Sequence, residues 1–176
     1  MLQSAVDQIR STYHEYPRQF WILMGSSFVD SLGSALLFPF FALYVTREFG
    51  IGLSQVGLIF AALTVATMIG TTIGGGLTDR FGRKSMAILG LVASALTILA
   101  LGFIRELEWF VPLAVLARLM VTIGGPARLA MAAVILPEEK RAGGFGMHRV
   151  IFNLAYVIGP ILGGVLAAYS YLYLFI

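Results

Sequence analysis

The 176-residue chain is too apolar for an ordinary soluble domain, since hydrophobic residues make up 59% of it, charged residues 12%, and the mean hydropathy is +0.88. The absence of cysteine excludes disulfide frameworks, thiolate metal sites and cysteine nucleophiles. The net charge of +3 does not indicate a nucleic-acid partner, because no basic face interleaved with aromatic residues lies outside the apolar runs. We therefore expect an integral membrane protein whose partner is the lipid bilayer.

Residues 1–19 form a polar N-terminal segment, which we expect in the cytoplasm. Apolar side chains recur in it at helical spacing, at Leu2, Val6, Ile9 and Tyr13. This pattern predicts either a short amphipathic helix on the inner membrane surface or a frayed polar tail.

Five apolar runs follow, and each is long enough to cross a hydrocarbon core of about 30 Å as a helix. They are continuous rather than alternating, which argues against an outer-membrane barrel. The runs cover residues 20–44, 56–77, 85–104, 109–136 and 150–169, and a sixth begins near Ser170 and reaches Ile176. Residues 20–176 are therefore predicted to form one all-α bundle of five complete transmembrane helices, truncated in the sixth. Because the loops at 46–54 and 137–144 are short, we expect consecutive helices to be antiparallel neighbours.

Positive residues in short loops set the expected orientation, because they favour the cytoplasm. With a cytoplasmic N-terminus, the outer loops hold only Arg47 and Arg105. The inner segments then hold seven positive residues: Arg10, Arg18, Arg80, Arg83, Lys84, Lys140 and Arg141. We expect a multi-pass protein of the bacterial inner (cell) membrane with its N-terminus in the cytoplasm.

The first run carries one charge, Asp30, about 15 Å deep at 1.5 Å per residue. A carboxylate near the bilayer midplane is costly, so Asp30 is our candidate proton carrier. Ser27, Ser31 and Ser34 share its helical face, which predicts a polar stripe along a water-filled cavity. Four aromatic residues near the outer end of the run are expected in the lipid belt rather than in a drug pocket: Phe38, Phe40, Phe41 and Tyr44.

The connector between the second and third runs, GGGLTDRFGRK at 74–84, is the most informative stretch of the chain. Gly82 permits a tight reversal, and Asp79 can accept hydrogen bonds from a helix N-terminus, so the connector can act as a latch. Alternatively, its positive residues only enforce the topology. The stretch resembles the signature that the major facilitator superfamily carries between its second and third helices, through Gly75, Asp79, Arg80, Gly82, Arg83 and Lys84. The resemblance implies that this latch braces two six-helix halves in the outward-open state.

The fourth run contains Arg118 and Arg128, and Arg118 lies about nine residues into it, at about the depth of Asp30. An unpaired charge in the membrane is costly, so we predict that Asp30 and Arg118 form a proton-sensitive pair. The alternative is a static structural ion pair. ARLMVTIGG resembles the family's fourth-helix motif R-x-x-x-G-x-G through Arg118 and Gly124, with Thr122 at the first glycine.

The fifth run and the segment before it carry a pattern of glycines around one proline, GFGMHRVIFNLAYVIGPILGG at 144–164. Gly159 and Gly163 are spaced for close helix approach, and Pro160 removes a backbone donor. Ordinary small-residue packing is the alternative interpretation. With Ala155 at one glycine position, the stretch resembles the helix-five motif of proton-driven antiporters through Gly146, Gly159, Pro160, Gly163 and Gly164. The resemblance implies exchange rather than symport.

Further polar residues are candidates for the wall of a cavity. Arg149, Asn153 and Tyr156 share one face of the fifth run, while the neighbouring His148 lies on another face and is expected at the interface. The full set of candidate cavity residues is Ser27, Ser34, Thr122, Arg149, Asn153 and Tyr156. We predict no metal site.

The resemblance covers residues from about Phe20 to Ile176 and implies the N-terminal half of a twelve-span major facilitator, similar to the drug/proton antiporters of the multidrug efflux type. A C-terminal six-helix half would then be missing. We expect truncation first, and the alternatives are a separate chain or a second copy of this chain. The resemblance implies a solute site at the midplane between the halves and access that alternates by rocking. We expect a lipophilic or cationic small molecule to be exchanged for protons, with the proton gradient as energy source and neither a cofactor nor enzymatic chemistry.

Two alternatives remain. One is a proton-coupled symporter or exporter of a sugar, a metabolite or a lipid-linked solute on the same fold. The other is a non-transporting membrane receptor or scaffold.

Overall fold

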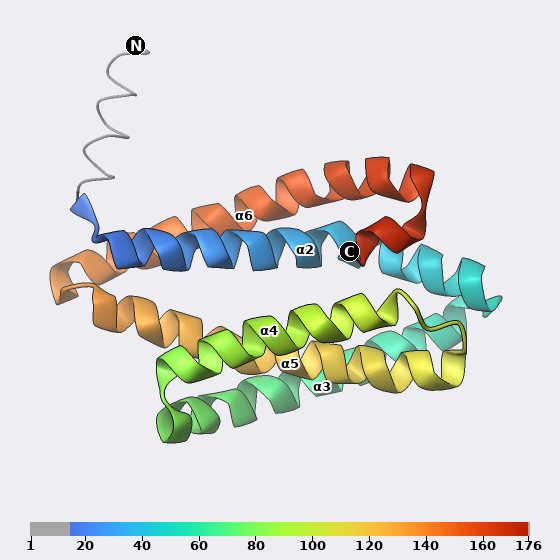
Figure 1. Cartoon of the computed structure of the whole chain (residues 1–176), viewed down its shortest axis with the longest axis horizontal. Helices are drawn as coiled ribbons and strands as arrows, with labels where there is room; N and C mark the ends of the chain where they lie inside the picture. The colour runs from blue at the N-terminus through green and yellow to red at the C-terminus, as the bar shows by residue number, and fades with distance from the viewer. Residues whose placement is uncertain (1–14, 176) are drawn as a thin grey trace, which may run out of the picture.

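The computed structural model describes residues 15–175, and this part of the chain is almost entirely helical (Figure 1). Its five long helices are α2 (Arg18–Phe49), α3 (Leu53–Phe81), α4 (Arg83–Leu101), α5 (Leu107–Ile135) and α6 (Glu138–Tyr169). All five are long and apolar enough to cross a membrane, which confirms the predicted all-α membrane bundle. Most of the predicted N-terminal segment, with its amphipathic pattern at Leu2 to Tyr13, lies outside the described residues.

All five helices begin before their apolar runs, and the loops are shorter than predicted except after α4, which ends at Leu101 instead of residue 104. α6 begins at Glu138 and has two glutamates in its first turn, where negative charge is favourable at a helix N-terminus. α2 continues to Phe49 and ends at Gly50, whose φ of 63° gives the left-handed conformation that commonly ends a helix. Hydropathy marks the part of a helix that crosses the membrane and misses the polar turns at its ends.

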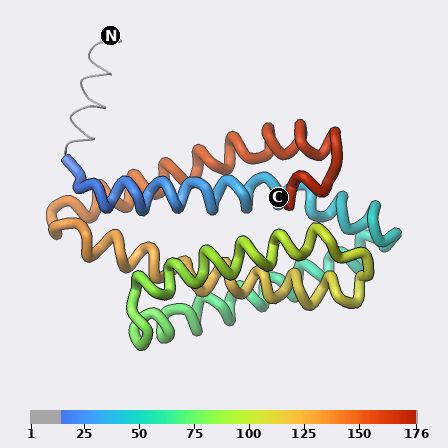
Figure 2. The backbone as a smooth tube through the Cα atoms, viewed as in Figure 1, coloured from blue at the N-terminus to red at the C-terminus, as the bar shows by residue number. Residues whose placement is uncertain are grey.

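The five helices lie in two layers (Figures 1 and 2). In one layer α2 packs along α6, and in the other α5 packs against both α3 and α4, while contacts between the layers are sparse. The expectation that consecutive helices are neighbours is therefore wrong for most pairs. It holds for α4 and α5, but the main partner of α2 is α6 rather than α3. A short loop fixes only where two helices start and end, and side-chain complementarity then decides which of them pack along their length.

Glycines allow the helices within each layer to approach closely. A Cβ placed on Gly159 would lie 2.5 Å from the Cβ of Ala35, so α6 approaches α2 at this point. A Cβ on Gly90 would lie 2.6 Å from the Cα of Gly124, where α4 meets α5 almost backbone to backbone. The predicted close approach at Gly159 is confirmed, and its partner is α2.

The reversal at Gly82 is as tight as predicted. Gly82 alone separates α3 from α4, its φ is 88°, and its N–H donates to the carbonyl of Thr78 over 3.0 Å. Residues other than glycine rarely adopt this backbone conformation. We call the end of the bundle that holds this turn, together with the start of α2 and the α5–α6 junction, the Gly82 end.

Two apolar clusters close the two ends of the bundle. The cluster at the Gly82 end contains Phe20 and Met24 of α2, packed against Ala132 of α5. At the opposite end, the ring of Tyr44 lies 5.7 Å from that of Phe110 between centroids. The residues expected to start a sixth span instead form a short 3₁₀ helix, η1 (Tyr171–Leu174), which folds back onto this second cluster. The polar side chains described next lie between the two clusters.

Candidate functional site

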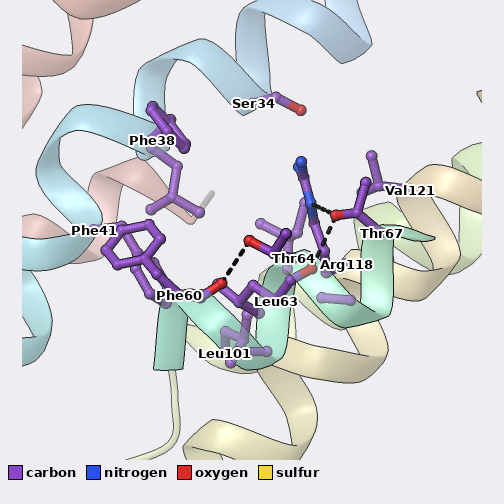
Figure 3. A pocket seen from close by; sticks show the side chains of 14 residues that line it. Ser34, Phe38, Phe41, Phe60, Leu63, Thr64, Thr67, Leu101, Arg118 and Val121 are labelled. Carbon is purple, nitrogen blue, oxygen red and sulfur yellow. Dashed lines mark hydrogen bonds between the residues drawn. The ribbon is translucent and has the colours of Figure 1, made fainter. Parts of the chain in front are cut away.

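A cavity of about 150 Å³ lies between the two layers, with walls from α2, α3, α4 and α5. Ten of its fourteen lining residues are aliphatic or aromatic, so the space suits an apolar group. The other four are Ser34, Thr64, Thr67 and Arg118 (Figure 3). Among the candidate cavity residues, only Ser34 is one of these.

Arg118 is held at the cavity by a neutral partner. Its Nε donates to Oγ1 of Thr67 over 2.8 Å, and the same Oγ1 donates to the carbonyl of Leu63 over 2.9 Å. In Figure 3 the guanidinium extends from α5 toward the side of the cavity that holds Ser34. None of the ion pairs formed by residues 15–175 includes Arg118. The cavity therefore has one cationic wall in otherwise largely apolar surroundings.

Asp30 pairs with Arg128, so the predicted pair of Asp30 with Arg118 is wrong. Nη2 of Arg128 lies 2.7 Å from Oδ2 of Asp30, and the two side chains are 11% and 13% exposed. The pair joins α2 to α5 and so links the two layers, which otherwise have few contacts. Arg128 is thus a functional candidate that the sequence analysis passed over.

The predicted pair of Asp30 with Arg118 was wrong because the depth of each charge in the membrane was counted from the start of its apolar run. Counting from the start of each apolar run placed both charges at the midplane, but α2 has 32 residues and α5 has 29, more than a minimal span needs. Counted from the ends that meet opposite the Gly82 end, Asp30 is about 19 residues along α2, whereas Arg118 is about 11 along α5. Arg118 is therefore displaced by roughly 12 Å, and Arg128 is level with the carboxylate. Full helix lengths would have identified the correct partner.

The residues of the predicted serine stripe do not line one cavity together. Ser27 is buried, and its hydroxyl has no hydrogen-bond partner among the described residues. Ser34 reaches the cavity, and Asp30 between them is bound to Arg128. His148 of α6, which was expected at the membrane interface, is partly buried and close enough to Arg128 to interact with its charge.

The remaining cavity candidates lie elsewhere. Thr122 packs against Gly70 at the α3–α5 contact, where its hydroxyl donates to the carbonyl of Arg118 over 2.9 Å. Three residues of α6 are exposed on its surface instead of lining the cavity: Arg149, Asn153 and Tyr156.

Two of the aromatic residues assigned to the lipid belt line the cavity. Phe38 and Phe41 project from α2, and their ring centroids lie 6.2 Å and 5.7 Å from that of Phe60 on α3 (Figure 3). Phe40 instead packs against Gly163, and Tyr44 is part of the apolar cluster. Composition alone could not separate these cases, because neighbouring positions on one helix face different surroundings.

The connector residues come together at the Gly82 end. Except for the partly covered Gly75, they are exposed: Asp79, Arg80, Gly82, Arg83 and Lys84. The guanidinium of Arg80 lies 5.5 Å from the ring centre of Phe81. Within residues 15–175, no ion pair includes Asp79 or Arg83, so the latch remains a prediction about a partner outside this part of the chain.

The helix-five motif divides between two faces of α6. Gly159 and Gly163 are buried against α2, whereas Gly146 faces open space and Pro160 lies within a continuous helix. Gly164 is in ordinary contact with Phe40. Part of the motif therefore serves packing inside the bundle, and its coupling role is untested. Among the described residues, no three histidine, aspartate or glutamate side chains lie close enough to hold a metal ion.

The family model described as Major Facilitator Superfamily matches residues 23–176. The Na⁺, Li⁺, K⁺/H⁺ antiporter of Planococcus maritimus is 32% identical over 151 residues, which cover 82% of this chain. The uncharacterized MFS-type transporter YttB of Bacillus subtilis is 28% identical over 91% of the chain, and the quinolone resistance protein NorA of Staphylococcus aureus is 26% identical over 88%.

The chain spans only 34–40% of the length of these relatives. Among solved structures, a bacterial homologue of the human lysosomal transporter Spinster, in an inward-facing and unoccupied conformation, superposes with a TM-score of 0.72 at 22% identity. That match covers 84% of this chain and 32% of the other, so the shared fold corresponds to part of a larger protein.

Proposed function

Because this chain belongs to the Major Facilitator Superfamily, we propose that it forms the N-terminal half of a secondary active transporter that exports lipophilic small molecules in exchange for protons. A C-terminal six-helix half supplies the opposite wall of the solute pathway. The names of two relatives support exchange and export, since one is a cation/proton antiporter and the other a quinolone resistance protein.

One observation carries this proposal: a buried acid–base pair lies within the membrane next to a solute-sized cavity. Asp30 and Arg128 join the two layers, and the cavity opens between the same layers nearer the opposite end of α2. Coupled transport needs a group that gains and loses a proton, a place for the solute and a mobile element that both can bias. Asp30 supplies the group that gains and loses a proton, and the cavity supplies the place for the solute. The sparse contacts between the layers allow the helices to move relative to one another.

In the proposed cycle, Asp30 accepts a proton from the outside and becomes neutral. Its attraction to Arg128 then weakens, which loosens the link between α2 and α5 and favours the conformation that faces the other side. Release of that proton to the cytoplasm restores the ion pair and resets the carrier. The proton binds to Asp30 and the solute binds in the cavity. They do not compete for one site, but each favours a different conformation of the helices.

We place the N-terminus and the Gly82 end in the cytoplasm of a bacterial inner (cell) membrane, following the distribution of positive residues. The exposed connector with Asp79 and Arg83 then faces the cytoplasmic edge of the C-terminal half, where a latch would form. A cationic solute, the other class expected, would need a carboxylate from the C-terminal half, because none of the lining residues is acidic.

The direction of proton movement tests the proposal. Proteoliposomes are loaded with solute and a pH-sensitive dye, and solute efflux is started by dilution. Exchange predicts that protons enter the vesicles as solute leaves and that an imposed proton gradient accelerates the efflux. Protons leaving together with solute would instead establish symport, and a stable protein with no flux of either would favour a receptor or scaffold.

A further inference from the structure

We propose that the cavity beside Arg118 binds the anionic end of an amphiphilic organic anion, a carboxylate or sulfonate carried on an aromatic or aliphatic body. The inference rests on the proposed function, because it names the substrate class for the same transporter.

The charge balance of the bundle points to an anion. Among the described residues, the membrane interior holds one carboxylate, Asp30, and it is already bound to Arg128 over 2.7 Å. Arg118 has a threonine hydroxyl as its side-chain hydrogen-bond acceptor. A guanidinium without a counter-charge is costly at membrane depth, so a negative group that enters the cavity gains a strong interaction.

The geometry favours a planar acceptor group. The bond from Nε to Thr67 fixes one edge of the guanidinium, and Thr67 is itself fixed by its bond to the Leu63 carbonyl. The terminal nitrogens extend toward Ser34 (Figure 3). A pre-oriented guanidinium fork matches carboxylate and sulfonate oxygens, and the Ser34 hydroxyl is a further polar group on the same side.

The body of the ligand follows from the other walls. Phe38, Phe41 and Phe60 line the side of the space away from Arg118 (Figure 3), and no lining residue is acidic. The cavity of about 150 Å³ accommodates one benzene-sized ring, and because it is partly open, the remaining rings of a larger ligand can extend out of it. A lipophilic anion satisfies both the rings and the cation, whereas a lipophilic cation would meet Arg118 with like charge.

Two dyes with the same ring skeleton test the charge. Anilinonaphthalene sulfonate carries a permanent negative charge, and N-phenylnaphthylamine lacks the sulfonate. Binding of each is measured by fluorescence with the purified protein in lipid nanodiscs, with empty nanodiscs as the blank. We expect Arg118→Gln to weaken binding of the sulfonate dye at least about tenfold and to change binding of the neutral dye less than about twofold, because only the charged contact is lost.

Matched variants separate charge from folding. Arg118→Lys keeps the charge but loses the planar fork, so its affinity for the sulfonate should lie between those of the wild type and Arg118→Gln. Arg105→Gln removes an exposed arginine that pairs with Glu48 at the bundle surface, and it should leave both dyes unaffected. Equal weakening of both dyes by Arg118→Gln would overturn the inference, because it would indicate a collapsed cavity. Unchanged sulfonate binding would also overturn it, as expected if a carboxylate of the C-terminal half neutralises Arg118.

The dye-binding result can be distinguished from the result of the proton-exchange test, because either one can fail without the other. Charge-selective binding without proton-coupled flux would leave the anion site intact and refute the proposed function. Proton-coupled flux of a solute with no dependence on the charge at Arg118 would support the proposed function and refute the anion site.

Discussion

Two arginines of α5, Arg118 and Arg128, have different surroundings. Arg128 is paired with a carboxylate in a largely buried position, whereas Arg118 is bound to a hydroxyl at the edge of a cavity. Both were visible in the sequence as charges inside an apolar run, and so was Asp30. Their partners were not, because an assignment of pairs needs the true lengths and the register of α2 and α5.

Removal of one member of the buried pair should be worse than removal of both. Arg128→Met leaves the Asp30 carboxylate inside the membrane without its cation, and we expect the stability of the protein to fall by about 3 kcal/mol. The double variant Asp30→Asn/Arg128→Met should recover most of that loss, since no charge remains unpaired. Thermal unfolding in detergent, followed by size-exclusion chromatography, measures both.

Arg149→Met is the control for this pair, since it removes an exposed arginine from α6. A single Arg128→Met variant as stable as the control would show that the ion pair contributes little to folding. A double variant less stable than the single one would contradict the role of the unpaired charge.

Thr67 should matter for the cavity through Arg118. Thr67→Val keeps the shape of the side chain but removes the acceptor for Nε, so the guanidinium loses its orientation. We expect sulfonate-dye affinity to fall severalfold, about 1 kcal/mol for one hydrogen bond. Thr64→Val is a matched control on the same wall, because the Thr64 hydroxyl donates only to the carbonyl of Phe60, 2.8 Å away. Equal effects of the two variants would argue against an orienting role for Thr67.

At the scale of helices, glycines decide which pairs pack tightly. The Gly159–Gly163 spacing was recognisable in the sequence as a close-approach pattern, although not its partner α2. The contact of Gly90 with Gly124 was not recognisable, because it exists only once α4 lies against α5. Spacing along one helix indicates which face is small and leaves the facing helix undetermined.

The α4–α5 contact should not tolerate a larger side chain. Gly90→Val places its Cβ within 2.6 Å of the Gly124 backbone, which cannot move without separating the helices, and we expect destabilisation of about 1–3 kcal/mol. Gly76→Val on α3 is the control, because a Cβ there meets nothing within 4 Å. The thermal midpoint of Gly90→Val in detergent should fall well below that of the control. Similar midpoints would mean that α4 and α5 are less closely packed than described.

At the scale of the whole molecule, the chain is a two-layer bundle with a polar level between two apolar ends. Its five spans were predictable because long uncharged runs have few other uses in a protein. The layer arrangement was not, since it joins α2 to α6 across most of the sequence. The sparse contacts between the layers concentrate the cross-links in a few side chains, among them Asp30 and Arg128. A change in the charge of one such residue can therefore alter the relative position of whole helices.

The most direct test of this coupling is transport by Asp30→Asn in proteoliposomes, measured with and without a proton gradient. We predict that the variant still exchanges labelled for unlabelled solute across the membrane, because the cavity is intact, but that a proton gradient no longer drives net movement. The wild-type protein should do both, and Glu108→Gln, which neutralises an exposed carboxylate in the first turn of α5, should keep the response to the gradient. An Asp30→Asn protein that retains full gradient-driven transport would contradict the assignment of Asp30 as the proton carrier.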